Sequence, residues 1–555
     1  MLKRFLLLVA LIVAPVAATA QGVVSSADPR ASAAGREILQ AGGSAADAAM
    51  AMMLALTVVE PQSSGIGGGG FMIHHDAGLG IIQTIDGREK APAAAGPNRF
   101  IGADGKPMPY SLAQPGGFSV GVPGNIRLMA RTHQRWGKLP WAQLFAPAIR
   151  LAEDGFVVNR TLANRLVASS KLFERFPEAR ALFLIDGQLA KEGDTIRNPA
   201  MAKTLRAIAE RGPDAFYTGE VGEAISAAVA NAPSNPTQLT LADLAAYQAK
   251  DRPAVCTHYR KYKVCGMGPP SSGATTVGQI LGMIERFDMK AMGKDDPRSW
   301  HAIAEAMKLA YADRDLYVGD ADFVSVPVPG MIDPAYMRAR SKLISLARPL
   351  GKYEPGTPPG AARRTRGPAD EVPGTTHFAA VDKDGNVANM TSTIEDAFGS
   401  QLVAGGFFLN NELTDFSMVP EVNGAPVANR VEPGKRPRSS MSPTIVYDES
   451  GQPVFAVGSA GGPRIIMHVL KSLVGYIDFG LSAQEAIALP NIFFTGDTTL
   501  VERGTFLEKM IPELSKIDGL VSASNLGSKL NAVERTAAGW RGAADPRSEG
   551  VALTE

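Results

Sequence analysis

The residue pair Gly374-Thr375 lies where a segment without apolar periodicity gives way to an alternating, strand-like segment. A chain break between these residues would give Thr375 a free α-amine beside its own hydroxyl. An α-amino group has an unperturbed pKa of about 7.7 to 8.0, so part of it is neutral near pH 7 and can take the hydroxyl proton. Such a threonine needs no histidine, and apart from His377 none of the 7 histidines lies in a triad-like setting. Taken alone, however, the pair is more often simply the start of a strand.

Other catalytic motifs are misplaced or missing. Residues 65–70, GIGGGG, satisfy the G-x-G-x-x-G pattern of dinucleotide-binding loops. Such a loop follows a strand and precedes a helix, whereas here a helix ended by Pro61 precedes it and a strand follows. The sequence contains no cysteine-histidine cluster and no H-E-x-x-H. We therefore predict neither a cofactor nor a metal.

The segment TTHFAAVDKDGNVANMTST, which begins at Thr375, resembles the sequence that opens the small subunit in the γ-glutamyltranspeptidase family. The resemblance extends along nearly the whole chain, through SGIGGGGFM (64–72), DGREKAP (86–92), PPSSG (269–273), LNNELTDFS (409–417), KRPRSSMSPTIV (435–446), GSAGGPRI (458–465) and ADPRSEG (544–550). It implies a hydrolase that cuts itself between Gly374 and Thr375 and then uses Thr375 as its nucleophile. The implied substrates are small γ-glutamyl compounds such as glutathione.

The resemblance also implies how the α-carboxylate of the substrate is bound. Arg88 resembles the family's carboxylate-binding arginine, and its guanidinium fork suits bidentate pairing with a carboxylate. Ser439 and Ser440 resemble the hydroxyls that complete this grip. Without the resemblance, a surface ion pair of Arg88 with Asp86 or Glu89 is the simpler interpretation.

Three acidic residues are implied around the α-ammonium. Glu412 and Asp415 resemble the acidic pair of the family, and their i, i+3 spacing can place both on one side of a turn. A solvated acidic loop is the alternative. Glu395 falls where many family members carry asparagine and some carry glutamate. Three carboxylates around one ammonium repel each other, so we expect a raised pKa for one of them unless a cation such as Arg438 or Arg464 lies near.

The remaining implied residues act on the reaction itself. Thr393 resembles the second threonine, which hydrogen-bonds the nucleophile and orients it. Gly461 and Gly462 resemble the family's oxyanion hole, and such a backbone donor contributes about 2.7 to 4 kcal/mol in other acyl-transfer enzymes. Glycine suits this place because it lets the backbone approach a ligand closely. A plain Gly-Gly turn is the alternative.

The implied reaction has two steps. Thr375 attacks the γ-carbonyl, releases Cys-Gly or another amine, and leaves a γ-glutamyl ester that water or an acceptor amino acid resolves, with ping-pong kinetics. Between Ser417 and Lys435 the chain is short and has no aromatic residue, whereas several family members carry a longer, tyrosine-bearing lid there. We therefore expect a pocket open to water and a substantial hydrolytic component.

Two other functions remain open at this point. A cephalosporin or glutaryl acylase shares the fold and the nucleophile, but its substrates lack the α-ammonium that Glu412 and Asp415 would bind. Alternatively, the chain is a secreted binding protein that has kept the fold without activity. It would then remain one uncleaved polypeptide of 58.4 kDa.

The elements that must position these residues change in type along the chain. An Ala-rich helical pattern runs over 33–60, with a break at Gly42-Gly43 and a capping-box restart at Ser44. A hairpin follows over 71–86. The first half is then mainly helical, with helices predicted over 141–154, 199–211, 220–230 and 299–311.

Residues 351–374 contain five Pro and five Gly and are predicted to form a flexible linker. Beyond it the chain is richer in strands: a hairpin about Asp384-Gly385 comes first, and strands are predicted over 406–409, 444–447 and 454–457. The fold class that the resemblance implies is α/β, the four-layer αββα sandwich of N-terminal-nucleophile hydrolases. Residues 21–374 would form the large subunit and 375–555 the small subunit, and this heterodimer would share one core.

Residues 1–20 resemble a secretory signal, with Lys3 and Arg4, an apolar run and an Ala18-Thr19-Ala20 end. The apolar run is about a dozen residues, shorter than the roughly 20 that span a bilayer as a helix. We therefore predict a secreted protein, periplasmic in a bacterium, that starts near Gln21 and has no membrane span; an uncleaved anchor is the alternative. The 56 basic and 55 acidic residues are mixed, which argues against a nucleic-acid partner.

The two cysteines, Cys256 and Cys265, lie in two short alternating runs about a predicted turn at Arg260-Lys261. A two-residue loop there places them directly opposite each other. A disulfide and two buried thiols are both compatible with this pattern. Neither cysteine has the electropositive surroundings of a nucleophile.

Overall fold

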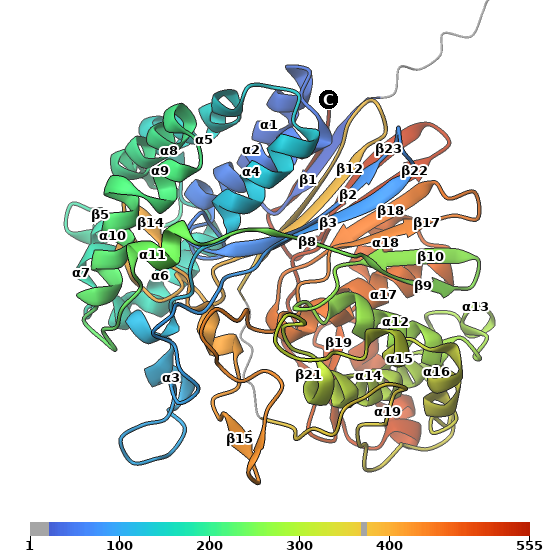
Figure 1. The fold of residues 1–555 in the computed structure, drawn as a ribbon. Coiled ribbons are helices and arrows are strands. Elements are labelled where there is room, and N and C mark those ends of the chain that lie inside the picture. The colour runs from blue at the N-terminus through green and yellow to red at the C-terminus, as the bar shows by residue number, and fades with distance from the viewer. Residues whose placement is uncertain (1–20, 368–373) are drawn as a thin grey trace, which may run out of the picture.

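Two β-sheets stacked face to face form the centre of the molecule, with helices on both outer faces (Figure 1). The computed structural model describes residues 21–367 and 374–555. The predicted signal sequence, 1–20, and the last part of the predicted linker, 368–373, lie outside the described residues. The arrangement is the predicted αββα sandwich.

The first sheet has seven strands, and its neighbours are all antiparallel. In spatial order they are β24 (Val551–Thr554), β1 (Val23–Ser26), β11 (Thr376–Val381), β12 (Val387–Thr393), β2 (Gly69–Asp76), β3 (Ile81–Gly87) and β8 (Lys250–Arg252). Strand β1, from the start of the chain, lies between two strands that follow Thr375. The sheet therefore joins the two predicted subunits.

The second sheet has six antiparallel strands and also mixes the two parts of the chain. In spatial order they are β23 (Gly539–Ala544), β22 (Asn531–Thr536), β18 (Pro453–Gly458), β17 (Thr444–Tyr447), β10 (Tyr262–Gly266) and β9 (Val255–Tyr259). Apolar side chains of both sheets meet between them, among them Phe71, Ile73, Ala379, Ile445 and Val533. This layer is the core that the two parts share.

Three helices cover the outer face of the first sheet: α1 (Pro29–Gln40), α2 (Ala45–Val59) and α4 (Asn125–Trp136). Every residue of α2 is buried, because the helix is packed between the sheet and neighbouring helices. Ser44 and Asp47 form the predicted capping box at its start. The end of α2 leads directly into the Gly-rich segment before β2, so this helix fixes where that segment enters the sheet.

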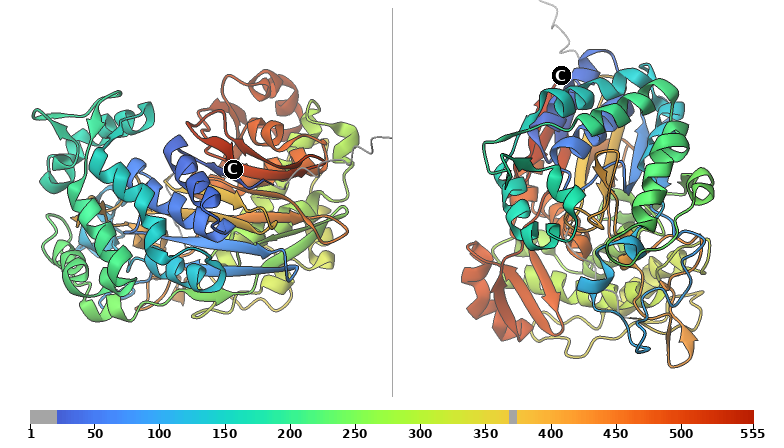
Figure 2. Two further views of the ribbon diagram at one scale, coloured as in Figure 1. Left: turned by 90° about the horizontal axis from the view of Figure 1, so that it is seen from above. Right: turned by 90° about the vertical axis from the view of Figure 1, so that its left-hand side faces the viewer.

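A helical arm extends this layer away from the sheets (Figures 1 and 2). It comprises η2 (Trp141–Phe145), α5 (Ala146–Asp154), α6 (Arg160–Phe173), α7 (Pro177–Ala181), α8 (Pro199–Arg211), α9 (Asp214–Tyr217), α10 (Gly219–Ala230) and α11 (Leu241–Ala245). Short strand pairs accompany the arm: β4 (Phe156–Val157) with β7 (Thr195–Ile196), β5 (Leu184–Ile185) with β6 (Gln188–Leu189), and β13 (Val403–Ala404) with β14 (Phe407–Phe408).

The outer face of the second sheet is covered by α12 (Gly273–Ile284), α17 (Ile465–Ile477) and α18 (Ala483–Ala488). Farther out lie α14 (Pro297–Tyr317), α19 (Phe506–Asp518) and the sheet of β19 (Ile492–Thr495), β20 (Thr498–Glu502) and β21 (Val521–Ser524). The remaining elements are α3 (Tyr110–Ala113), η1 (Gly117–Ser119), α13 (Met289–Met292), α15 (Val328–Met331), α16 (Pro334–Ser341), η3 (Glu412–Asp415), β15 (Glu421–Val422), β16 (Ala425–Pro426) and η4 (Gly462–Arg464).

The predicted elements are found, with three differences. The predicted helix 141–154 is divided into η2 and α5, because Pro147 lies in the first turn of α5 and starts a new helix there. The predicted helix 299–311 is longer, since α14 begins at the Asp296 cap and continues to Tyr317. The predicted strand 406–409 shrinks to β14, which pairs only with the equally short β13.

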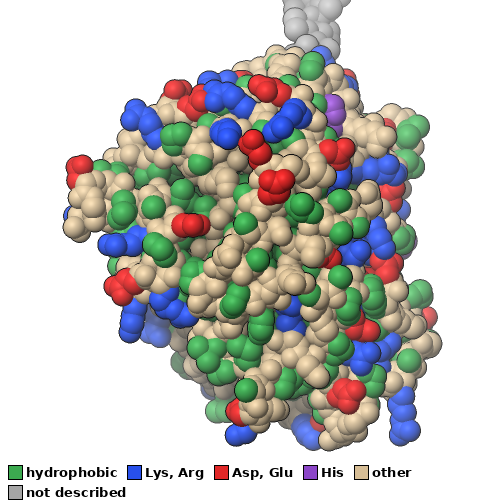
Figure 3. Space-filling model, turned by 60° about the vertical axis from the view of Figure 1, so that its left-hand side comes forward, with side chains coloured by type: hydrophobic (Ala, Val, Ile, Leu, Met, Phe, Trp, Pro, Cys, Tyr) green, Lys and Arg blue, Asp and Glu red, His purple; other side chains and the backbone are tan. Residues whose placement is uncertain are grey.

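Cys256 and Cys265 lie opposite each other on β9 and β10, as the turn at Arg260-Lys261 predicts. They form a disulfide with an S–S distance of 2.07 Å, so of the two alternatives the structure contains the disulfide. Within 21–367 and 374–555, no helix is both long and apolar enough to cross a bilayer. Basic and acidic side chains are interspersed on the face shown in Figure 3.

Candidate active site

Thr375 lies immediately before β11, with only 5% of its surface exposed. Its hydroxyl donates to the hydroxyl oxygen of Thr393 at 3.1 Å. Strands β11 and β12 are antiparallel, and Thr376 is opposite Ser392. Thr375, which precedes Thr376, therefore lies next to Thr393, which follows Ser392. The Thr393 oxygen also accepts the N–H of Glu395 at 2.8 Å, which fixes its orientation. The structure thus brings the predicted nucleophile and the predicted second threonine into contact.

The chain is uncleaved and bent at Thr375. Its φ of 93° is rare for a β-branched residue and is strained, which costs about 1 to 3 kcal/mol. The preceding residue must be glycine, because a Cβ on Gly374 would lie 1.5 Å from the carbonyl oxygen of Glu395. The bond between Gly374 and Thr375 is therefore held in a tight, strained position.

Gly461 and Gly462 form a turn between β18 and α17 with φ values of 132° and 58°. These conformations favour glycine, which explains the pair physically. The N–H of Gly461 donates to the carbonyl oxygen of Gly374 at 3.3 Å. A predicted oxyanion-hole donor therefore already contacts the carbonyl of the bond that is predicted to be cut.

A small cavity on the hydroxyl side of Thr375 brings most of the predicted binding residues together. Its lining includes Arg88, Thr375, Thr393, Glu395, Glu412, Asp415, Ser439, Ser440 and Gly462, with apolar contributions from Met441 and Ile465. Its volume is about 20 Å³, which is room for about one water molecule. Gly461 lines a neighbouring cavity, which Thr375 also borders.

Arg88 lines this cavity and is buried, so its ion pair with Glu89, in which Nη1 lies 3.7 Å from Oε2, is not on the surface. Its guanidinium pairs with the carboxylates of Glu412 and Asp415, and its Nε and Nη2 donate to the carbonyl oxygens of Pro437 at 3.2 Å and Arg438 at 2.8 Å. Glu412 and Asp415 lie in η3 and are themselves buried, so the solvated-loop alternative is also excluded. Arg88 and the predicted ammonium ligands form one ion-paired unit.

The two serines are held by neighbouring backbone and by an arginine. The Ser439 N–H donates to the carbonyl oxygen of Pro270 at 3.0 Å, and its carbonyl accepts the Ser272 N–H at 2.8 Å. These contacts place the PPSSG segment beside the two serines. Ser440 accepts a hydrogen bond on its hydroxyl oxygen from Arg314 at 2.6 Å.

Burial changes the acid–base properties of the carboxyl groups. It raises the pKa of Glu412 to about 8, although the positive charge of Arg88 acts in the opposite direction. Burial also raises the pKa of Glu395 well above its usual value, and the neighbouring carboxylates of Asp415, Asp396 and Glu412 add to this rise. A raised pKa is thus found for more than one carboxyl group. Arg88 is a cation beside these acids, and Arg438 lies 3.4 Å from Asp315.

The sequence did not indicate two of the hydrogen-bond donors to Glu395. The Tyr110 hydroxyl donates to Glu395 Oε2 at 2.8 Å, and the side-chain amide of Asn411 donates to the same oxygen. Tyr110 begins the four-residue helix α3, far from Glu395 in sequence, and no pattern around it indicates a site. Asn411 lies within the LNNELTDFS motif, so the resemblance could have suggested it.

One other buried cluster has the composition of a metal site. His301, Glu305 and Asp518 have ligand atoms within 4.8 Å of one another. However, both ring nitrogens of His301 are hydrogen-bonded, to Asp518 at 2.7 Å and to the Ser345 carbonyl at 2.8 Å, and Lys308 donates to Glu305 at 3.0 Å. A lysine thus already supplies the positive charge, and the cluster is an ion-pair network between α14 and α19.

Comparisons with known proteins agree with this geometry. The chain is 36% identical to the glutathione hydrolase proenzyme of Bacillus subtilis (strain 168), covering 96% of this chain and 91% of that protein. It is 38% identical to the glutathione hydrolase proenzyme of Escherichia coli (strain K12), over 95% and 90%. The crystal structure of cephalosporin acylase from Bacillus halodurans superimposes with a TM-score of 0.85, at 29% identity over 96% of each chain. The family profile described as Gamma-glutamyltranspeptidase matches residues 31–554, and the chain belongs to this family.

Proposed function

We propose that this protein is a γ-glutamyltransferase and glutathione hydrolase that is made as a proenzyme and cuts itself before Thr375. One observation carries the proposal: Thr375 and its hydroxyl partner Thr393 line one cavity together with a buried arginine that pairs with the carboxylates of Glu412 and Asp415. A glutamyl group has an α-carboxylate for Arg88 and an α-ammonium for Glu412 and Asp415. Its γ-carbonyl is then directed toward the nucleophile.

Self-cleavage needs only groups that already meet at Gly374. The Thr375 oxygen attacks the Gly374 carbonyl, the Gly461 N–H stabilises the oxygen that becomes negative, and the C–N bond breaks as the nitrogen takes a proton. Water then hydrolyses the resulting ester, which leaves a carboxylate on Gly374 and a free amine on Thr375. The strained φ of Thr375 is released in this step. Residues 21–374 and 375–555 would be the two subunits.

Turnover repeats this chemistry on a γ-glutamyl amide. The free amine of Thr375 takes the hydroxyl proton, the oxygen attacks the γ-carbonyl, and the amine returns the proton to the leaving nitrogen. Thr393 orients the nucleophile, and backbone N–H groups of Gly461 and Gly462 meet the charge on the carbonyl oxygen. Before cleavage the nitrogen of Thr375 is part of a peptide bond and cannot act as the base, so the precursor would be the inactive form.

The retained acids favour this activity over that of a glutaryl acylase. A glutaryl group offers no α-ammonium, so Glu412 and Asp415 would gain no second positive partner beside Arg88. The short 418–434 segment, which carries the small β15–β16 hairpin, supports a large hydrolytic share, and the N-terminal signal pattern supports secretion, into the periplasm in a bacterium.

The test compares fragments and substrates. Purified protein should give two fragments, the smaller beginning Thr-Thr-His by N-terminal sequencing, and Thr375→Ala should stay a single inactive chain. The processed enzyme should prefer a γ-glutamyl anilide to the matched glutaryl anilide. Preference for the glutaryl compound would identify an acylase, and an uncleaved, inactive wild type would identify a binding protein. In the same assay, water should compete measurably with an added dipeptide acceptor for the acyl-enzyme.

A further inference from the structure

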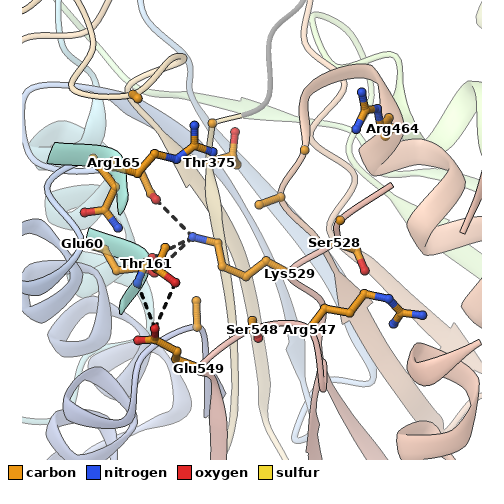
Figure 4. A pocket seen from close by; sticks show the side chains of 18 residues that line it. Glu60, Thr161, Arg165, Thr375, Arg464, Ser528, Lys529, Arg547, Ser548 and Glu549 are labelled. Atoms are coloured by element: carbon orange, nitrogen blue, oxygen red, sulfur yellow. Dashed lines mark hydrogen bonds and ion pairs between the residues drawn. The ribbon is translucent and has the colours of Figure 1, made fainter. Parts of the chain in front are cut away.

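A second cavity borders Thr375, and its charged side chains have no part in the mechanism above. It has a volume of about 350 Å³, and Thr375, Gly374 and Gly461 form part of its wall. Figure 4 shows the Lys529 side chain extending across this cavity toward Glu60. The Thr375 nitrogen and the Lys529 ammonium both contact the same residue, Ser63.

The contacts form a continuous chain from the nucleophile to a buried ion pair. The Thr375 N–H donates to the Ser63 carbonyl at 3.1 Å. Lys529 Nζ donates to the Ser63 hydroxyl oxygen at 3.1 Å and to the two carboxylate oxygens of Glu60 at 2.9 and 3.2 Å. Glu60 is 2% exposed and ends α2, and Ser63 lies in the turn that follows.

Lys529 also reaches the oxyanion side of the site through its main chain. Its carbonyl accepts the N–H of Ala460 at 3.3 Å, and Ala460 directly precedes Gly461. One residue is therefore linked to the amine of the nucleophile by its side chain and to the oxyanion turn by its backbone. Glu60 and Ser63 belong to the predicted large subunit, whereas Lys529 and Thr375 belong to the small one.

We propose that the Glu60–Lys529 ion pair is a positioning unit, which aims the α-amine of Thr375 through Ser63 and keeps it unprotonated so that it can act as the base. This inference rests on the proposed function, because the α-amine exists only after cleavage. The Lys529 ammonium disfavours a second positive charge at the neighbouring amine. The Glu60 carboxylate holds Lys529 in place and limits this effect. Neither side chain need touch the substrate.

The other charged side chains around the cavity either have ion-pair or hydrogen-bond partners or are left unchanged by the variants described below. Arg547 pairs with Glu502 at 2.5 Å and Asp545 at 3.0 Å, and Glu549 accepts hydrogen bonds from Thr161. Arg165 and Arg464 line the same cavity. Asp28 adds negative charge near Glu60, whose carboxyl has a pKa raised by burial. On the other side of Thr375 lie Arg88, Glu395, Glu412 and Asp415, which no variant below changes.

The experiment measures kcat/KM for a γ-glutamyl anilide from about pH 6 to about pH 9, where the acidic limb reports the base of the free enzyme. Lys529→Met removes the cation, so the α-amine should hold its proton more tightly and the acidic limb should move to higher pH by about 1 unit. Glu60→Gln removes the anion and should move the limb to lower pH. Lys529→Arg keeps the charge and should restore the wild-type limb.

A milder variant and a matched pair complete the set. Ser63→Ala removes only the hydroxyl that holds Lys529 and should shift the limb in the same direction as Lys529→Met, by less. If Lys529→Met is not cleaved before Thr375, the shift of the acidic limb in Ser63→Ala tests the proposal in its place. Lys516→Met breaks the exposed Lys516–Glu513 pair on α19, whose atoms are 2.7 Å apart, and should leave the profile unchanged.

The outcomes separate the two proposals. Opposite shifts for Lys529→Met and Glu60→Gln, with rescue by Lys529→Arg, support the positioning unit. Processed variants with wild-type acidic limbs, or with shifts in one direction only, would overturn it and leave a structural ion pair, even if their melting temperatures fall. A wild type that is never cleaved before Thr375 overturns the proposed function as well.

Discussion

At the residue scale, the site is dominated by charge taken out of water. One guanidinium, that of Arg88, lies within ion-pair distance of three buried carboxyl groups, those of Glu89, Glu412 and Asp415, and the carboxyl group of Glu395 lies near them. Such an arrangement is stable only if part of the negative charge is neutralised by protons or by a ligand cation. The ammonium group of a glutamyl substrate is the cation that we propose for this place.

Because the pKa of Glu412 is raised, binding of the substrate ammonium should depend on pH. Because burial raises that pKa to about 8, the carboxyl is mostly neutral at pH 7 and becomes charged as the pH rises through about 8. Donor binding by the wild type should therefore tighten over this range. Glu412→Gln cannot ionise, so its KM should match the wild-type KM near pH 6 and exceed it by up to about tenfold near pH 9.

The measurement is the ratio of the two KM values for one γ-glutamyl anilide across this range. Glu421→Gln, at an exposed position on β15, is the matched control and should give a ratio near one throughout. A Glu412→Gln ratio that stays constant with pH would show that Glu412 does not titrate in this range.

At the element scale, the start of β11 determines the surroundings of the proposed nucleophile and of the proposed cleavage site. The strand pairing sets Thr375 against Thr393, and the close approach of the Glu395 carbonyl leaves no space for a side chain at position 374. The same backbone geometry thus selects glycine before the nucleophile and a hydroxyl partner opposite it. The Glu395 that limits this space also lines the donor cavity.

Gly374→Ala should therefore slow self-cleavage. The added Cβ must displace the Glu395 carbonyl, and overpacking of this kind costs about 1 to 3 kcal/mol, which corresponds to a slowing of about tenfold or more. The conversion of precursor to fragments, followed by gel electrophoresis over time, measures it. Gly96→Ala is the control, because a Cβ there meets no atom within 4 Å. Cleavage of Gly374→Ala at the wild-type rate would mean that the chain is not confined at this residue.

At the scale of the whole molecule, cleavage cannot separate the two parts. Strand β1 pairs with β11 on one side and β24 on the other, and β10 pairs with β17 in the second sheet. Both sheets contain strands from each part of the chain. The break before Thr375 therefore changes the ends of the chain at the site and leaves the packing of the sandwich intact.

The fragments should consequently co-purify and unfold together. Pulse proteolysis at increasing urea concentrations should remove both gel bands at one midpoint, because neither fragment has a core of its own. The uncleaved Thr375→Ala protein provides the comparison and should also lose its single band cooperatively. A smaller fragment that disappears at a lower urea concentration than the larger one would contradict the shared core.

The sequence by itself determined most of the elements and indicated the proposed nucleophile. Alternation about Asp384-Gly385 and the capping box at Ser44 are local signals, and both appear in the structure because neighbouring residues set turns and caps. The motifs in family order indicated Thr375, and the structure brings nearly all of the residues they suggested to one cavity. Their separate chemical roles remain predictions.

Only the tertiary structure decided which distant groups surround the nucleophile. Tyr110 reaches Glu395, and Lys529 reaches Glu60 and Ser63, across separations of 285, 469 and 466 residues. No local pattern encodes such contacts, because they arise when the sheets stack and bring remote loops together. Burial follows from the same packing. It raises the pKa of Glu412 and turns what the sequence allowed to be a solvated acidic loop into a cluster of buried acidic groups.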